Sequence, residues 1–109
     1  MVKRIINKSA DAVKNENISY IDDIISENWN RKKNFIEETK IFFKNNDIND
    51  IEIVKTMAEI NNNRAKVGVF AVIKANLENL GEVKGRQVVG LKIQKENRKW
   101  LITDIKFEK

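Results

Sequence analysis

The sequence contains no cysteine, no histidine and no proline among its 109 residues. Without cysteine the chain has no disulfide framework, no thiolate metal site and no thiol nucleophile. Without histidine it lacks the commonest metal ligand and the usual acid–base group near neutral pH. No apolar run approaches the roughly 20 residues that span a bilayer. These absences favour a protein that is not an enzyme, with no cofactor, no metal and no membrane segment in this chain.

The size and composition of the chain are typical of a single globular domain. With 41% hydrophobic and 34% charged residues, it is predicted to be one domain over residues 1–109 with one core. The net charge of +5 lies in residues 51–109. Lysine, asparagine and isoleucine are abundant, as AT-rich coding sequences produce, so the basic balance is only weak evidence for an anionic partner. Nucleic-acid binding is not favoured, because Phe70 is the only aromatic candidate among the basic strand positions Lys66, Lys74, Lys84, Arg86, Lys92 and Lys99.

The first half of the chain has helical periodicity. Apolar residues recur three and four positions apart, which predicts helices at about 2–14, 18–28 and 31–45. Asn17 is a candidate N-cap for the second helix, because its short side chain can accept from the free N–H groups of the first turn. Phe35, Phe42 and Phe43 are expected in the core.

From about residue 50 the hydrophobic period changes from 3.6 to 2. The alternation predicts strands at about 51–60, 64–77, 83–95 and 99–107. Short turns join strands that follow one another in sequence, which makes an antiparallel meander. Helices first and strands last predict an α+β fold, in which the helices pack on one face of a curved four-stranded antiparallel sheet.

The last two predicted strands resemble a known family. The segment Glu96-Asn97-Arg98-Lys99-Trp100-Leu101-Ile102-Thr103-Asp104-Ile105 resembles the closing hairpin of the nuclear transport factor two-like (cystatin-like) superfamily. Arg64-Ala65-Lys66-Val67-Gly68-Val69 resembles its second long strand, and Ala12-Val13-Lys14-Asn15-Glu16-Asn17-Ile18 resembles its opening helix and break. The order and spacing of these motifs cover most of the chain. Two departures are the absence of a clear short strand between the helices and the absence of glycine in the closing turn.

The resemblance implies a cone, in which a bent sheet wraps the helices and leaves a cavity at the wide end. Members of this superfamily use the cavity for catalysis or ligand binding, or leave it filled, and many dimerise through the outer sheet face. The same order of elements resembles the periplasmic domain of type IV secretion assembly factors. Fold alone does not choose among these uses.

Few residues are candidates for a chemical site. Tyr20 and Asp104 are the polar groups that an isomerase-like or ligand-binding cavity would use, although each is more typical of a surface position. Trp29 and Trp100 are expected to fill the core rather than stack a ligand. Asp22-Asp23 and Glu37-Glu38 diverge on a helix and make poor metal ligands. No glycine-rich phosphate loop precedes a helix.

The outer face of the sheet carries the favoured function. Phe70, Val72 and Val88 lie among the outward positions, and an apolar patch of this kind marks a partner surface. We therefore expect a non-enzymatic binding or scaffolding domain that forms a homodimer through its sheet. The alternatives are a small-molecule-binding or isomerase-like cavity protein with a small apolar ligand, a domain with a different protein partner, and a soluble domain of a type IV secretion or conjugation assembly factor.

The N-terminal residues give an expectation for the cellular compartment of the protein. Residues 1–8 begin like a signal peptide, but the apolar stretch of two residues is too short for one. A complete chain is therefore expected in the cytoplasm, and a chain whose upstream leader or anchor was removed is expected outside it.

Overall fold

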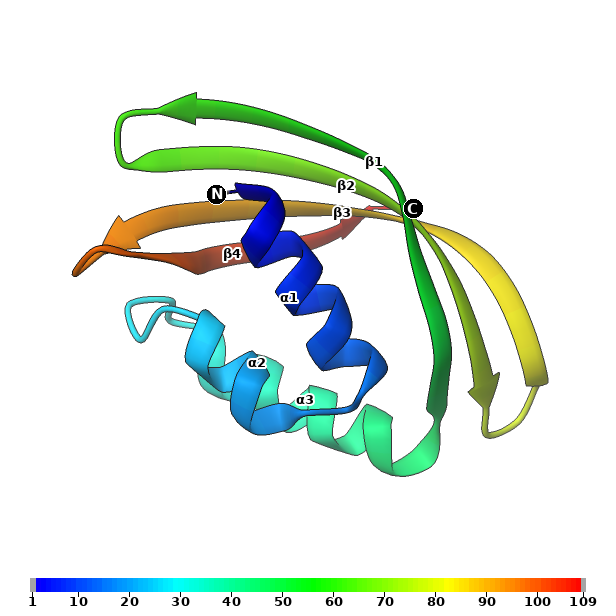
Figure 1. Ribbon diagram of the computed structural model, residues 1–109. Coiled ribbons are helices and arrows are strands. Elements are labelled where there is room, and N and C mark those ends of the chain that lie inside the picture. Colours follow the sequence, from blue (N-terminus) through cyan, green and yellow to red (C-terminus); the bar gives the residue numbers. More distant parts are fainter. Residues whose placement is uncertain (1, 109) are drawn as a thin grey trace.

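Three helices precede four strands (Figure 1). The computed structural model describes residues 2–108. The elements are α1 Val2–Lys14, α2 Ile18–Ile24, α3 Lys32–Asn45, β1 Asp47–Asn61, β2 Arg64–Leu77, β3 Gly81–Glu96 and β4 Lys99–Glu108.

The strands form one antiparallel sheet in the order β1-β2-β3-β4, so each strand pairs with its neighbour in sequence. The sheet curves around the helices, which occupy its concave face (Figure 1). Asparagine at a left-handed backbone position serves two of the tight turns, at Asn62 (φ 57°) and Asn97 (φ 50°), because its side chain tolerates that region. The α+β fold predicted from the sequence is confirmed.

Cross-strand register decides which side chains meet the helices. Val67 of β2 pairs with Leu91 of β3, and Ala65 pairs with Ile93. All four of these side chains are buried. Side chains on a strand alternate between the two faces, so the residues between them point away from the helices. Irregular register at Val54 in β1 and at Thr103 in β4 bends these two strands.

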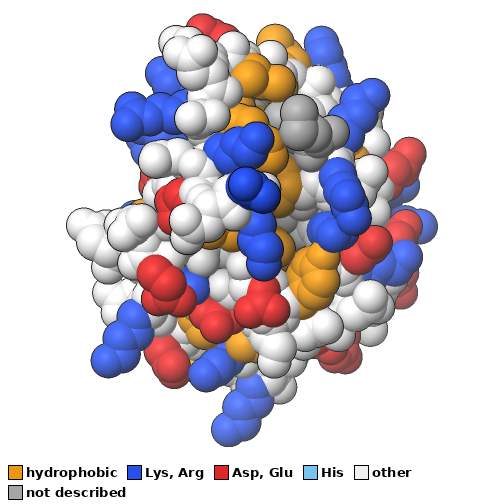
Figure 2. All heavy atoms as spheres, turned by 60° about the vertical axis from the view of Figure 1, so that its left-hand side comes forward, with side chains coloured by type: hydrophobic (Ala, Val, Ile, Leu, Met, Phe, Trp, Pro, Cys, Tyr) orange, Lys and Arg blue, Asp and Glu red, His pale blue; other side chains and the backbone are white. Residues whose placement is uncertain are grey.

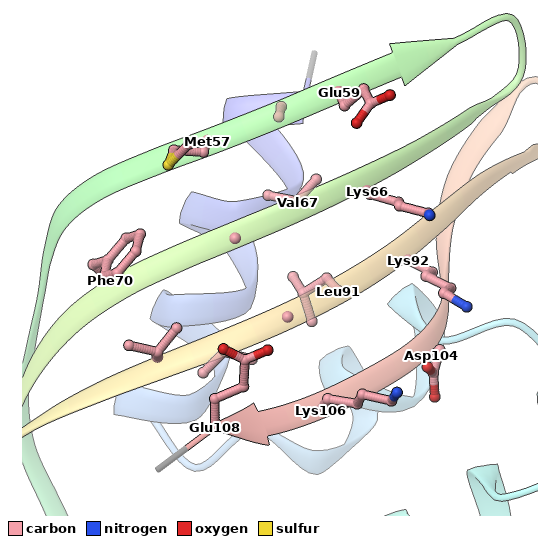
Figure 3. A pocket seen from close by; sticks show the side chains of 15 residues that line it. Met57, Glu59, Lys66, Val67, Phe70, Leu91, Lys92, Asp104, Lys106 and Glu108 are labelled. Atoms are coloured by element: carbon pink, nitrogen blue, oxygen red, sulfur yellow. The ribbon is translucent and has the colours of Figure 1, made fainter.

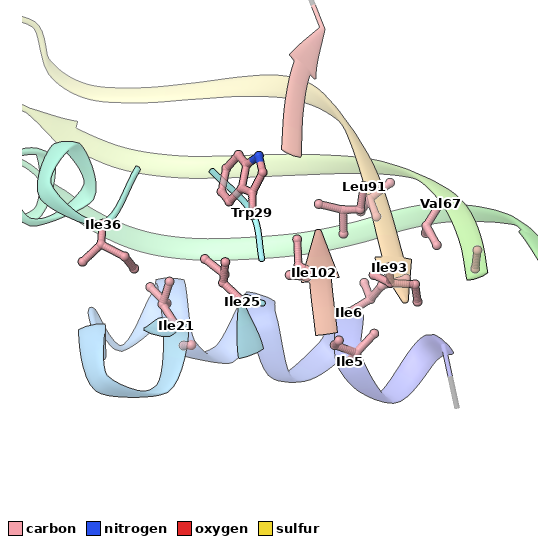
Figure 4. Packing of buried hydrophobic residues seen from close by; sticks show 13 residues of the cluster. Ile5, Ile6, Ile21, Ile25, Trp29, Ile36, Val67, Leu91, Ile93 and Ile102 are labelled. Atoms are coloured by element: carbon pink, nitrogen blue, oxygen red, sulfur yellow. The ribbon is translucent and has the colours of Figure 1, made fainter. Parts of the chain in front are cut away.

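The core lies between the helices and the concave face (Figure 4). Ile93 is its most buried hydrophobic residue, with 1% of its surface exposed, and Ile102 of β4 lies beside it. The other buried members come from all three helices, the α2–α3 connection and two strands: Ile5, Ile6, Ala12, Ile21, Ile25, Trp29, Ile36, Ala65, Val67, Val69 and Leu91.

Phe42 departs from the prediction for the third helix. Phe35 and Phe43 pack partly buried against the core, but Phe42 is exposed at the surface and contacts Phe43 with ring centroids 6.3 Å apart. Adjacent residues on a helix point about 100° apart, and the face of α3 that packs against the core runs through Ile36 and Phe43, which leaves Phe42 outside it.

The second helix ends at Ile24, four residues before the predicted end. Ile25 adopts an extended conformation (φ −102°, ψ 132°) and forms a parallel bridge with Ile102 of β4. The N–H of Ser26 donates to the carbonyl of Ile102 at 2.8 Å. This tertiary pairing competes successfully with continuation of the helix, and a local pattern does not reveal it. Asn17 does cap the helix, its Oδ1 accepting from the N–H of Tyr20 at 3.1 Å.

A polar network fixes the same connection to the β3–β4 hairpin. Ser26 is fully buried, and its Oγ donates to the carboxylate of Glu96 at 2.8 Å. The Oγ also accepts from the backbone N–H of Asn28 at 3.1 Å, and the amide of Asn28 donates to Glu96 at 3.2 Å. A buried hydroxyl without such partners would be costly, so the network accounts for a polar residue at a core position.

Two strands begin earlier than predicted. β1 starts at Asp47 instead of residue 51, because its first residues continue the ladder with β2 as far as Asn76. β3 starts at Gly81 instead of residue 83, where a positive φ of 69° suits glycine in the turn. Backbone pairing rather than side-chain hydrophobicity sets both boundaries.

Substitution of Ile93 tests the position of the core. Ile93→Ala should lower the free energy of unfolding by about 3 kcal/mol, because the truncated side chain leaves a cavity among well-packed neighbours. Ile60→Ala is the matched control: Ile60 pairs with Ala65 in the same cross-strand row but is 57% exposed. Urea denaturation measures both. Equal losses for the two variants would contradict this assignment of the core.

Candidate protein-binding face

The convex face of the sheet, which we call the outer face, carries three consecutive cross-strand rows. Each row contributes one residue from β1, β2, β3 and β4 in turn. The rows are Glu59, Lys66, Lys92 and Asp104; Met57, Gly68, Gly90 and Lys106; and Lys55, Phe70, Val88 and Glu108.

The middle row forms a hollow in this face. A cavity of about 450 Å³ lies over it, open to solvent (Figure 3). Its floor is the backbone at Gly68 and Gly90, which pair across β2 and β3. No atom lies within 4 Å of where a Cβ would stand on Gly68, so the absence of a side chain there keeps the hollow open. Met57 and Phe70 border the hollow, 55% and 38% exposed respectively.

The predicted dimer-face residues do not all lie in this hollow. Phe70 and Val88 are cross-strand partners and line it together. Val72 lies one row further along β2, opposite Arg86, and is half-buried. The hollow therefore groups two of the three residues, and Val72 continues the apolar strip along β2.

Charge on the outer face is mixed in sign. Lys66 stands directly opposite Lys92, a pairing of like charges that is unfavourable by itself. An acidic residue flanks this lysine pair on each side, because Glu59 of β1 pairs with Lys66 and Asp104 of β4 pairs with Lys92. Acidic and basic side chains are likewise interspersed, with apolar atoms between them, on the side of the molecule drawn in Figure 2. Such a surface suits a protein partner better than a polyphosphate.

Tyr20 and Asp104 are not brought together. Tyr20 lies on α2 and borders a small hollow of about 220 Å³ beside α1, with Lys8, Asp11 and Asn17 among its neighbours. Asp104 lies on the outer face of β4, on the opposite side of the sheet from the helices. In this arrangement the two groups do not share a cavity.

Aromatic side chains fill the space between helices and sheet. Trp29, from the α2–α3 connection, is 8% exposed, and its ring centroid lies 5.4 Å from that of Phe35. Trp100 of β4 packs partly buried against the same cluster. Trp29 thus occupies a core position, as expected from the sequence, and Trp100 lies at the edge of the core.

Among residues 2–108, no three Asp or Glu side chains converge. Asp22 instead accepts from Lys32, whose Nζ lies 3.2 Å from its Oδ1. The same Nζ donates to the Glu27 carboxylate at 2.6 Å and to the carbonyl of Ile25 at 2.9 Å. These three partners join the end of α2 to the start of α3 and account for a buried lysine.

The pKa of Lys32 reflects these contacts. Burial by itself lowers the pKa, but the hydrogen bonds to Glu27 and Asp22 and the charges of both carboxylates outweigh it. The pKa of Lys32 is therefore raised above its ordinary value of 10.5. On β1, the hydrogen bond and charge of Lys14 lower the pKa of exposed Asp50, at a Nζ–Oδ1 distance of 3.2 Å.

Comparison with known proteins identifies the fold. No family model and no curated protein matches the sequence. Among solved structures, a nuclear transport factor two-like protein of unknown function from Pseudomonas putida superposes with a TM-score of 0.80 at 8% identity, over 98% of this chain and 82% of that one. A provisionally assigned calcium/calmodulin-dependent kinase II association domain from Exiguobacterium sibiricum gives 0.81 at 8% identity, over 97% and 88%. A provisionally assigned ketosteroid isomerase from Shewanella frigidimarina gives 0.71 at 12% identity, over 96% and 92%.

These matches show that the chain has the nuclear transport factor two-like, or cystatin-like, fold that the closing hairpin suggested. At these identities they show the fold alone. Within residues 2–108, no helix has the length and hydropathy needed to cross a membrane.

Several residues of the outer hollow carry no clear signal in the sequence. Met57 and the Gly68–Gly90 pair belong to no motif, although the alternation of β2 places Gly68 on the same face as Phe70. The facing of Met57 depends on the irregularity at Val54, which shifts the alternation of β1 by one residue. The partners of Lys32 are close in sequence, but the fold of the connection brings them together.

The contacts of Lys32 predict how the stability of a Lys32 variant depends on pH. Lys32→Met should lower the free energy of unfolding at neutral pH by about 1–2 kcal/mol, chiefly because the Ile25 carbonyl loses its donor, while the exposed carboxylates of Asp22 and Glu27 add little. Because the pKa of Lys32 is raised on folding, the charged side chain contributes its full stabilisation below pH 10.5. This contribution is lost as the pH rises through the pKa of Lys32 in the folded state. The difference between wild type and variant, measured by urea denaturation, should therefore shrink above that pH.

Lys33→Met serves as the control, because Lys33 is the exposed neighbour on the same helix. It should change stability by less than about 0.5 kcal/mol. A Lys32→Met deficit that stays constant from neutral to strongly alkaline pH would contradict the ionic role of Lys32.

Proposed function

We propose that this protein is a non-enzymatic binding or scaffolding domain that forms a homodimer through the outer face of its sheet. The observation that carries the proposal is the hollow over Gly68 and Gly90, bordered by the exposed side chains of Met57 and Phe70. Apolar side chains beside an open glycine floor gain by burial against a partner, because apolar surface leaves water.

A symmetric dimer suits this arrangement. In a twofold interface the same patch serves both copies, so a protruding side chain and a hollow on one patch can complement each other. Phe70 protrudes next to the glycine floor, and aromatic side chains seated in pockets dominate the binding energy of many interfaces. The phenyl ring of one copy would then cover the glycine floor of the other.

The provisionally assigned kinase association domain among the structural neighbours gives further support, since that protein has the same fold and is named for association. That role belongs to the neighbour. For this chain it favours a protein partner over a nucleic acid, in agreement with the mixed charges of the outer face.

The isomerase-like alternative has one supporting observation, the neighbour assigned provisionally as a ketosteroid isomerase. Two observations weigh against it: Trp29 and Phe35 pack together in the core between helices and sheet, and Tyr20 and Asp104 are separated by the sheet. A small apolar ligand in the interior would have to displace these rings. The role in secretion or conjugation stays a prediction.

The dimer proposal is tested at Phe70. Phe70→Lys should weaken dimerisation at least about tenfold, because it places a charge in a desolvated contact. Sedimentation equilibrium over a range of concentrations measures the dissociation constant. Phe107→Lys is the matched control, because Phe107 is an exposed phenylalanine that pairs with Val89 on the other face of the sheet. Wild-type protein that sediments as a monomer throughout would show the interface proposal to be wrong.

A further inference from the structure

One part of the sheet has an open edge. β3 is longer than β4, and the last pair between them joins Val88 to Glu108. Within residues 2–108, residues 81–87 of β3 pair with β2 alone, and this end of the strand projects beyond β4 in Figure 1. The side chain of Gln87 marks the junction, its Nε2 donating to the carbonyls of Val88 and Glu108 at 3.0 Å each.

The direction of the backbone groups along this edge follows from the ladder. The N–H of Lys95 donates to Asn63, next to β2, whereas the carbonyl of Lys92 accepts from Thr103 of β4. Alternate residues of an antiparallel strand turn their N–H and C=O to the same side. The even-numbered residues of β3 therefore turn toward β4, and beyond its end Glu82, Lys84 and Arg86 present these groups at the open edge.

The side chains on this edge are predominantly basic. Lys84 and Arg86 share the outer face, and Lys84 pairs with Lys74 on β2, so like charges face each other. Within residues 2–108, none of these three cations has a carboxylate within ion-pair distance. Glu82, near the turn, is the single acid on this stretch.

Beyond the end of β4, strands β2 and β3 continue as an arm of the sheet, and the β2 side of this arm is covered by β1. There β1 supplies an extended segment that alternates acidic and apolar residues, Asp50-Ile51-Glu52-Ile53. Asp50 pairs with Lys74, and Ile51 pairs with Ile73 on the concave face. The chain itself thus covers one edge of this arm with an acidic and apolar strand.

The concave side of the open edge has room for apolar side chains. Gly85 pairs with Ile73, and no atom lies within 4 Å of where its Cβ would stand. Half-buried Val83 lies beside it. A strand added here would direct one set of side chains over Gly85 and Val83, and the alternate set toward Lys84 and Arg86.

We propose that residues 81–87 of β3 bind an extended peptide segment of a partner protein, in which acidic residues facing Lys84 and Arg86 alternate with apolar residues. Main-chain hydrogen bonds supply affinity in this mode of recognition, and alternate side chains supply specificity. A second copy of the same edge suits it less well. Antiparallel self-pairing over the whole of residues 81–87 places Lys84 against Lys84, where like charges repel.

The proposal is independent of the outer-face dimer and is tested with synthetic peptides. Fluorescence anisotropy should show that labelled Thr-Val-Glu-Val-Glu-Val-Thr binds about tenfold more tightly than Thr-Val-Lys-Val-Lys-Val-Thr, with affinity falling as salt rises. Lys84→Pro should abolish binding of the acidic peptide, because it removes an N–H that points outward and leaves the β2 ladder intact. Circular dichroism verifies that this variant folds.

Further variants separate the outcomes. Lys84→Glu combined with Arg86→Glu keeps the backbone and should reverse the preference toward the lysine peptide, which preserves the test if the proline variant unfolds. Ile60→Ala should bind the acidic peptide as wild type does, because Ile60 lies next to the β1–β2 turn, at the opposite end of the sheet from this edge. Equal affinity for the two peptides would overturn the proposal. A wild-type dimer that Lys84→Pro dissociates would also overturn it, in favour of self-pairing at this edge.

Discussion

Contact between the α2–α3 connection and β4 organises the molecule. Ile25 and Ser26 join the edge of the sheet through the bridge to Ile102 and the 2.8 Å hydrogen bond to its carbonyl. This contact holds the helices against the concave face, where Ile93 and Ile102 are buried. Because side chains alternate along each strand, filling one face commits the other set of residues to solvent or to a partner. The outer face is thus a consequence of how the helices dock.

The two proposed binding surfaces arise from the same sheet in different ways. The outer hollow results from glycine at paired positions, Gly68 and Gly90, between larger side chains. The open edge results from unequal strand lengths, since β3 extends past the last pair with β4 at Val88. One surface offers apolar side chains and the other offers backbone groups with basic side chains, so the two proposals call for partners of different chemistry. Both lie outside the core, which Trp29 and its neighbours fill.

Much of the fold could be predicted from the sequence, because alternation and helical periodicity are local signals. They placed Phe70 and Val88 on one face, and the structure brings both to the hollow. Features that depend on tertiary contact were missed: the early end of α2 at Ile24 requires Ile102, and the facing of Met57 requires the irregularity at Val54. Phe42 is exposed because the apolar stripe in the sequence of α3 is wider than the face of the helix that packs against the core. The function is harder to infer from the sequence, because the sequence contains no recognisable acid–base or metal-binding motif.

Nuclear magnetic resonance tests the outer-face dimer most directly. Methionine occurs only twice in the chain, so methyl-labelled methionine gives a simple spectrum in which Met57 reports on the hollow. In an equal mixture of methyl-labelled and unlabelled protein, a filtered Overhauser experiment detects contacts between different molecules only. A dimer through the outer face should give such contacts from the Met57 methyl group to aromatic protons of Phe70 in the other copy. Their absence at concentrations where the protein is dimeric by sedimentation would rule out a dimer through this face.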